Sequence, residues 1–372
     1  MEGSDAEPKQ FSVTTQNMQQ VFFVGYNTIS GNVVLDLVEP KKTRGVFIQL
    51  LGRVTTDWTE KTDGSGDNNS KTMHFHGTET VVDIKKALWV PPTGAESDFL
   101  QPGQYTMPFL FETQGLALPP NFKGPYGKIT YVLRASIGRP WKWDHRTFLP
   151  ITLLPVRDCN DPRFDTPLER QEEKTMCCCC CASGPIVATA RVPSAAWCPG
   201  ELVPFHVHVE NHSNKPMNNI TCELGSTTKF FAPGGKSADD KRVVGENLRR
   251  AVPAGCYFDD TVFLRVPSCC PTIERAIGRL IEHEYWLQVT VHLPSGSFDL
   301  HMRMPVTIGT VPHKNPSLVP GKDAAQTPVY NWANPEGITQ AATAAAQASA
   351  GAAGATPAAQ ATPYQDAYQD SS

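Results

Sequence analysis

Residues 203–210, Val-Pro-Phe-His-Val-His-Val-Glu, decide the fold class. Phe205, Val207 and Val209 alternate with polar residues, so an extended chain places its apolar side chains on one face and its polar side chains on the other. Burial on one face only is typical of an antiparallel sheet that covers a core on one side and meets water on the other. We therefore expect a half-buried strand here.

The same period of two recurs in both halves of the chain, at residues 33–36, 46–51, 81–86, 285–291 and 300–304. Pro and Gly together make up 60 of 372 residues, about 16% against a usual 12% or so, which favours many turns. No amphipathic helix pattern precedes residue 156. Ile273 to Ile281 fits either a single helical turn or a strand, and we favour the strand. The sequence predicts an all-β protein whose antiparallel strands form sandwiches or barrels.

Shifts in composition predict the domain boundaries. The segment between the two alternating blocks is polar and contains Pro162 and Pro167, which favours a linker. Residues 337–362 are about half alanine and carry no charge, so they offer a core nothing to dock. We expect a disordered N-terminus, a first sandwich, a short linker, a second sandwich and a disordered low-complexity tail at 1–10, 11–156, 157–176, 177–311 and 312–372.

Charge and composition exclude several functional classes. The net charge of -4 disfavours nucleic-acid binding, which needs a basic surface. No run of 18 apolar residues predicts a transmembrane helix, and the polar N-terminus does not resemble a secretory signal. Eleven cysteines in a chain of this size are then expected as thiols in a reducing cytoplasm.

Seven blocks in order resemble the arrestin-domain-containing proteins, or α-arrestins: residues 30–37, 100–112, 118–141, 174–186, 198–214, 271–294 and 304–312. They include an Arg-Pro-Trp sequence at 139–141 and a cysteine cluster followed by Ser-Gly-Pro-Ile. The resemblance implies two antiparallel, immunoglobulin-like β-sandwiches of the arrestin type, joined by a short linker. It also implies a non-enzymatic cytoplasmic adaptor with no cofactor. Such adaptors bind cytoplasmic parts of membrane receptors or transporters, direct endocytosis and sorting with trafficking proteins, and can associate peripherally with the plasma membrane or endosomes.

The chain departs from that family in two places. Many α-arrestins recruit ubiquitin ligases through Pro-Pro-x-Tyr motifs, but both Pro-Pro pairs here continue differently, as Thr93-Gly94 and Asn121-Phe122. Recruitment through that motif is therefore not expected. The thioredoxin-binding member uses one cysteine of its second domain; Cys256 lies in roughly that region, although its neighbours differ. A redox-partner protein acting through its cysteines remains an alternative.

Five consecutive cysteines are the most unusual feature of the sequence: Cys177, Cys178, Cys179, Cys180 and Cys181. Structural zinc sites space their cysteines, so one tetrahedral ion does not readily take adjacent ligands. Three interpretations of this cysteine run remain: a strand that buries alternate thiols, a cluster modified by S-acylation, and a metal or redox site.

Two further patterns carry chemistry. His74 and His76 precede Glu79, and a similar pair follows at His206 and His208; a strand places such pairs on one face, as metal binding requires. A cupin-like metal-binding β enzyme is thus a second alternative. The other interpretation is that these histidines lie on the solvated face of a strand. The basic residues Lys41, Lys42 and Arg44 form a candidate patch for acidic or phosphorylated cargo, or an ordinary solvated turn.

Overall fold

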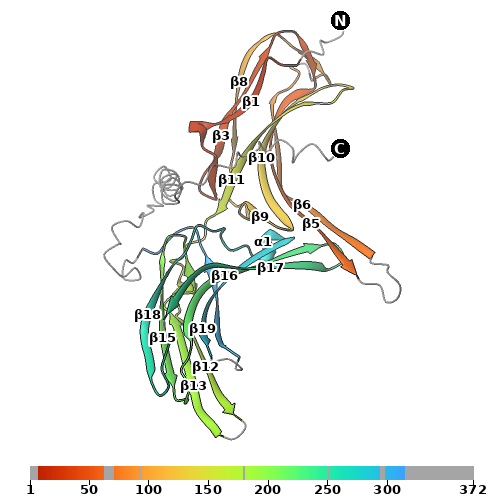
Figure 1. The fold of residues 1–372 in the computed structure, drawn as a ribbon. Coiled ribbons are helices and arrows are strands. Elements are labelled where there is room, and N and C mark those ends of the chain that lie inside the picture. The colour runs from red at the N-terminus through yellow and green to blue at the C-terminus, as the bar shows by residue number, and fades with distance from the viewer. Residues whose placement is uncertain are drawn as a thin grey trace, which may run out of the picture. The chain divides into compact units, whose positions relative to one another are not determined.

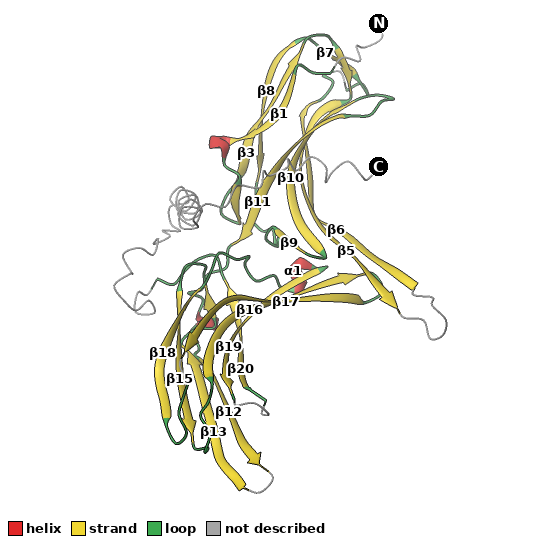
Figure 2. Cartoon of the chain, in the orientation of Figure 1, coloured by secondary structure: helices red, strands yellow, loops and turns green. Residues whose placement is uncertain are grey.

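The structure, a computed structural model, describes residues 7–62, 71–92, 94–178, 181–249, 251–293 and 298–314. Within these ranges the chain forms two β-sandwiches with three very short helices, so the predicted all-β class is confirmed (Figures 1 and 2). No helix of the described residues is long and apolar enough to cross a bilayer. The N-terminal six residues and the expected low-complexity tail from residue 315 onward lie outside the described residues.

The first sandwich packs a three-stranded sheet against a six-stranded one. The smaller sheet has the order β1 (Gln10–Thr15), β3 (Ile29–Leu37), β8 (Gly103–Phe111). The larger sheet has the order β2 (Val21–Val24), β11 (His145–Pro155), β10 (Gly127–Gly138), β5 (Gly45–Thr62), β6 (Lys71–Trp89), with β9 (Phe122–Gly124) beside β10. A two-stranded sheet, β4 (Lys41–Thr43) with β7 (Asp98–Leu100), completes it; η1 (Gln16–Met18) is a single 3₁₀ turn.

The second sandwich pairs sheets of four and five strands. One has the order β12 (Leu168–Cys178), β13 (Cys181–Val192), β15 (Leu202–Asn211), β18 (Tyr257–Arg265). The other has the order β14 (Ala196–Trp197), β20 (Leu300–Ile308), β19 (Ile281–His292), β16 (Asn219–Ala232), β17 (Lys236–Arg249). The helical turns η2 (Pro162–Phe164) and α1 (Arg275–Gly278) lie outside both sheets.

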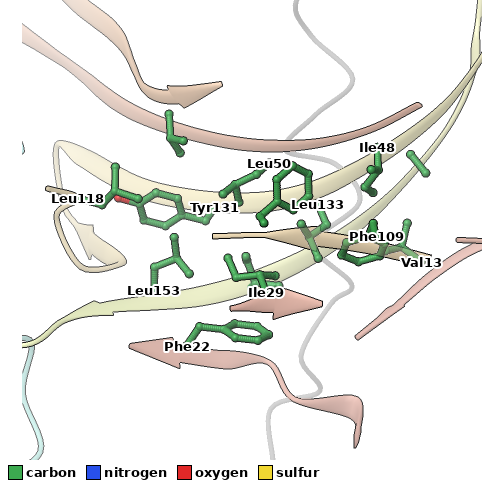
Figure 3. Packing of buried hydrophobic residues seen from close by; sticks show 14 of the residues in the cluster. Val13, Phe22, Ile29, Ile48, Leu50, Phe109, Leu118, Tyr131, Leu133 and Leu153 are labelled. Atoms are coloured by element: carbon green, nitrogen blue, oxygen red, sulfur yellow. The ribbon is translucent and has the colours of Figure 1, made fainter. Parts of the chain in front are cut away.

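The apolar residues that alternate in the sequence are buried in the structure, as expected. In β15, Phe205, Val207 and Val209 are fully buried, whereas His206 between them is exposed. In the first sandwich, Ile48, Leu50, Tyr131 and other apolar side chains from facing strands meet in one core (Figure 3). The buried Tyr131 hydroxyl donates a hydrogen bond to the carbonyl oxygen of Pro119 at 2.7 Å, which satisfies its polar atom inside that core.

Three stretches differ from the sequence expectation. β12 occupies the last nine residues of the expected linker: it is an edge strand with mostly exposed side chains, so it pairs through its backbone without an apolar pattern. Residues 275–278 form the helical turn α1, which was the alternative to the favoured strand; at the two ends of this stretch Ile273 is bridged to His283 and Ile281 begins β19. The expected tail begins too early, because His313 is buried against Glu201.

The core of the first sandwich is completed by residues of the second. Phe230 of β16 is fully buried, 5.6 Å from the ring of Tyr126 and 6.2 Å from that of Phe122, measured between centroids. Ala232, Ile273 and Ile281 join the same apolar cluster. The Thr56 hydroxyl donates to the carbonyl of Phe231 at 2.7 Å, and Arg279 forms an ion pair with Glu79. The two sandwiches are therefore joined by packed hydrophobic side chains as well as by the covalent linker.

Candidate functional site

The candidate basic patch lies on β4, where strand alternation divides its members. Lys41 and Thr43 point inward and are buried, while Lys42 and Arg44 are exposed. The Thr43 hydroxyl donates to the carbonyl of Gly138 at 2.7 Å, which fixes β4 to the end of β10. Only two of the three predicted residues are thus presented to solvent, on a backbone that the sheet holds in place.

The buried Lys41 belongs to a polar cluster beneath that surface. Its Nζ lies 2.9 Å from Nε2 of His145, and Nη1 of Arg139 lies 3.1 Å from the same nitrogen. Since lysine and arginine can only donate, Nε2 of His145 accepts from both cations. Lys41 therefore serves to position the loop between β10 and β11, and a ligand cannot reach it directly.

That loop, residues 139–144, brings further groups beside Arg44. The Asp144 carboxylate lies 3.4 Å from the Arg44 guanidinium and accepts the backbone N–H of Arg139 at 3.0 Å. Trp141 has a left-handed φ of 61° and is fully exposed, and Trp143 is 80% exposed. We call Lys42, Arg44, Trp141 and Trp143 the basic edge. Sequence reasoning missed both indoles, since only the folded hairpin shows that they project from the sandwich.

The other predicted sites lie on the second sandwich. Cys256 is exposed on the turn before β18, and its carbonyl accepts the backbone N–H of Asn211 at 2.9 Å. In the cysteine run, Cys178 is the register partner of Cys181, so the run spans the end of the β12–β13 hairpin. Cys179 and Cys180 lie outside the described residues, as do the side chains of Cys177, Cys178 and Cys181.

The histidine pairs lie on solvated strand faces. His74, His76 and His208 contact carboxylates, whereas Nδ1 of His206 lies 2.9 Å from the Thr261 hydroxyl. His74 Nε2 is 2.7 Å from Asp57, and both side chains are 60% exposed. His208 and His212 approach Glu210 at 3.1 and 2.9 Å, and these hydrogen bonds lower the pKa of the Glu210 carboxyl. The two predicted pairs lie on separate sandwiches, on β6 and β15, so they do not combine into one site.

Sequence reasoning did not find a buried group that we call the thiol cluster: Cys159, Cys198, Glu201 and His313. The two Sγ atoms are 3.3 Å apart. Glu201 accepts the backbone N–H of Cys198 at 2.6 Å and the backbone N–H and Nδ1–H of His313 at 2.8 and 3.1 Å. Residues 159 and 313 come from segments expected to be a linker and a tail, so no pattern in the sequence could bring them together.

Among the described residues, the two thiols and the Glu201 carboxylate form the group whose ligand atoms converge closely enough for a metal ion. A soft divalent ion such as zinc accepts these donor types. However, the Glu201 oxygens already accept three hydrogen bonds that hold the turn after Cys198 and the segment around His313. The carboxylate therefore has a structural role that a metal would disturb.

Comparison with known proteins gives the family context. Residues 11–160 match the N-terminal domain of the arrestin (or S-antigen) family, and residues 182–313 match the C-terminal domain of that family. Human arrestin domain-containing protein 4 is 26% identical over 314 residues, which is 84% of this chain and 73% of that protein. Arrestin domain-containing protein 17 of Caenorhabditis elegans is 25% identical, covering 86% of this chain and 74% of its own. Human thioredoxin-interacting protein is 23% identical, covering 81% and 74%.

Proposed function

The chain belongs to the arrestin family, with α-arrestins among its relatives, and from that membership we propose that it is a non-enzymatic adaptor of the cytoplasm. It would bind cytoplasmic parts of membrane receptors or transporters and pass them to the trafficking machinery for endocytosis and sorting. Family membership supports the adaptor role in general. The basic edge supports the cargo-binding part.

The basic edge suits an acidic, extended peptide. Lys42 and Arg44 offer exposed positive charge, and Arg44 also pairs with Asp144 at 3.4 Å. Trp141 and Trp143 offer exposed aromatic surfaces on the loop that carries Asp144. Charge-assisted hydrogen bonds from lysine and arginine to carboxylate or phosphate are stronger than neutral ones, and exposed aromatic rings often anchor peptides. We propose that this edge contacts acidic or phosphorylated segments of cargo.

Reversing the charge of the basic edge should weaken cargo binding. The double variant Lys42→Glu with Arg44→Glu is expected to lower affinity for an acidic or phosphorylated cytoplasmic peptide roughly tenfold or more, because two charge-assisted contacts become repulsive. Affinity is measured by fluorescence anisotropy at 50 and 200 mM salt, and the wild-type affinity should fall with salt.

The matched control is the double variant Lys236→Glu with Lys241→Glu, two exposed lysines of β17 in the second sandwich. It changes the net charge by the same four units and should leave peptide affinity within about twofold. Equal losses in the control and in the basic-edge variant would show a general charge effect and contradict the assignment of the basic edge.

We further propose that cysteines of the run from Cys177 to Cys181 are S-acylated and hold the adaptor at the plasma membrane or endosomes. The backbone register supports this, because the end of a hairpin can be presented to an acyltransferase. A single acyl chain gives only marginal anchoring, so two modified cysteines, or one together with bound cargo, are needed.

Replacing all five cysteines of the run by serine should abolish a hydroxylamine-sensitive acyl label and shift the protein from the membrane fraction to the soluble fraction. Cys256→Ser, which removes an exposed thiol elsewhere, should keep both the label and the membrane fraction. Thermal unfolding establishes first that the five-serine variant is folded. An unlabelled wild-type protein whose membrane fraction resists hydroxylamine would exclude S-acylation as the anchor.

One observation favours a second candidate function. Cys256 is an exposed thiol on the second sandwich, and one relative is named thioredoxin-interacting protein. A redox-partner role through Cys256 is therefore a proposal beside the adaptor role.

A further inference from the structure

The paired thiols of the thiol cluster are held together by strand pairing. Asp158 forms a parallel bridge to Val311, and the backbone N–H of Cys159 donates to the Val311 carbonyl at 3.0 Å. Cys198 directly follows β14, which runs parallel to β20, and the N–H of Gly309 donates to the carbonyl of Trp197 at 2.9 Å. The segment 309–311 thus positions both cysteines. Cys159 lies in the segment that connects the two sandwiches, and Cys198 lies in the second sandwich.

The space around the sulfur atoms is fitted to them. A Cβ atom added at Gly309 would lie 2.5 Å from Sγ of Cys159 and 3.5 Å from Sγ of Cys198. Cys159 and Cys198 are 3% and 4% exposed, so their surroundings restrict them to the observed contact. A glycine at 309 leaves room for two sulfur atoms at a distance that a small side-chain movement turns into a bond of about 2.05 Å.

We propose that Cys159 and Cys198 form a site of reversible oxidation, in which a hydroperoxide converts the two thiols into an intrachain disulfide. This site is separate from the basic edge, from Cys256 and from the cysteine run. It does not depend on the proposed adaptor function.

The chemistry balances with a hydroperoxide as the only co-reactant. One thiolate attacks a peroxide oxygen; an S–O bond forms, the O–O bond breaks, and hydroxide leaves to take up a proton as water. The second sulfur then attacks the sulfenic sulfur; the S–S bond forms, the S–O bond breaks, and a second water leaves. In total two thiols and one hydrogen peroxide give one disulfide and two waters.

Contact between the sulfurs decides the product. The sulfenic acid forms about 3.3 Å from its partner sulfur, and both residues are almost fully buried, so the intramolecular step precedes attack by a second peroxide. The hydrogen bond to Cys159 and burial raise the pKa of the Cys198 thiol, so the reaction is slow at neutral pH and accelerates as pH rises. Because Cys159 and Cys198 are only 3% and 4% exposed, a small peroxide reaches their sulfur atoms more readily than a large disulfide reagent does.

The disulfide would fasten the connector to the second sandwich. The two cysteines are 39 positions apart along the chain, and the enclosed segment contains the whole β12–β13 hairpin. A cross-link over a loop of that length restricts the unfolded chain and so stabilises the folded one. Oxidation would therefore make the chain segment that connects the two sandwiches more rigid. Because both cysteines are buried, the exposed surface would stay the same.

The test uses the full, reduced chain treated with hydrogen peroxide at pH 7 and pH 8.5. After peptide digestion without reductant, mass spectrometry should find the peptides of Cys159 and Cys198 joined, with a loss of two hydrogens, more rapidly at pH 8.5. The melting temperature should rise by roughly 3–6 °C and return after treatment with dithiothreitol. Cys159→Ser and Cys198→Ser should show no rise, whereas Cys256→Ser should behave as the wild type.

The wild-type peptide map decides the proposal even if a serine variant fails to fold. Oxidation of Cys256 while Cys159 and Cys198 are recovered as separate thiols or as sulfinic acids would overturn it. So would a stoichiometric zinc ion in the purified chain that blocks alkylation of both thiols until a chelator removes it, because the cluster would then be a metal site.

Discussion

Replacement of Phe230 by alanine is expected to lower the free energy of unfolding by about 3–5 kcal/mol, the usual range for a large buried aromatic side chain. Phe230 is fully buried, and its ring packs on Phe122 and Tyr126 of the first sandwich. Truncation would leave a cavity where the two halves of the chain meet. We therefore expect the first sandwich to lose stability although the substitution lies in the second.

Urea unfolding followed by tryptophan fluorescence measures this effect. The matched control is Lys229→Ala, one residue earlier on the same strand, whose side chain is 38% exposed and pairs with Glu282 at 3.3 Å. An exposed ion pair contributes at most about 1 kcal/mol, so the control should stay near the wild type. A loss of less than about 1 kcal/mol for Phe230→Ala would contradict the shared core.

Acidification should weaken the same junction through His283. Burial lowers the pKa of His283 to about 4 from its ordinary 6.5, while Asp240 and Arg242 act in opposite directions. The folded state therefore resists protonation that the unfolded chain accepts. The stability that neutral His283 contributes is fully present above pH 6.5 and is lost as pH falls toward 4, by roughly 1 kcal/mol at pH 5.5 and roughly 2–3 kcal/mol at pH 4.5.

The variant His283→Asn cannot take up this proton, so its unfolding free energy should fall less with acidity than that of the wild type. Urea unfolding at pH 7 and pH 4.5 gives the difference between the two slopes, in which the other titrating groups cancel. His206→Asn, which removes an exposed histidine on β15, should keep the wild-type pH dependence. Parallel curves for wild type and His283→Asn would show that His283 is protonated equally in both states.

The sequence predicted the strands wherever one face is buried and the other is solvated. Phe205, Val207 and Val209 illustrate this, because burial of every second side chain requires an apolar residue at every second position of the sequence. The edge strand β12 has no such alternation, since it is stabilised by backbone hydrogen bonds to β13 while most of its side chains remain in water. The sequence could not decide between a strand and the helical turn α1, because four residues are too few to show a period of 3.6.

The candidate sites could be predicted only as far as they are local in sequence. Lys41, Lys42 and Arg44 are adjacent and could be picked out, but which of them face solvent depends on the orientation of β4. The thiol cluster depends on tertiary pairing alone, since Cys159 and His313 are 154 positions apart in the printed sequence. Distances of this kind arise from sheet topology, which a single sequence does not contain.

The shared core has a consequence for synthesis of the chain on the ribosome. Translation proceeds from the N-terminus at about 5–20 residues per second, and the first sandwich ends near Pro155. Its apolar cluster stays open until Phe230 and then Ile273 and Ile281 emerge, about 125 residues later. During those seconds the nascent first sandwich exposes Phe122 and its neighbours. We expect general chaperones to bind the nascent chain during this interval, because its apolar surface is exposed. Fragments that stop before Ile281 should aggregate for the same reason.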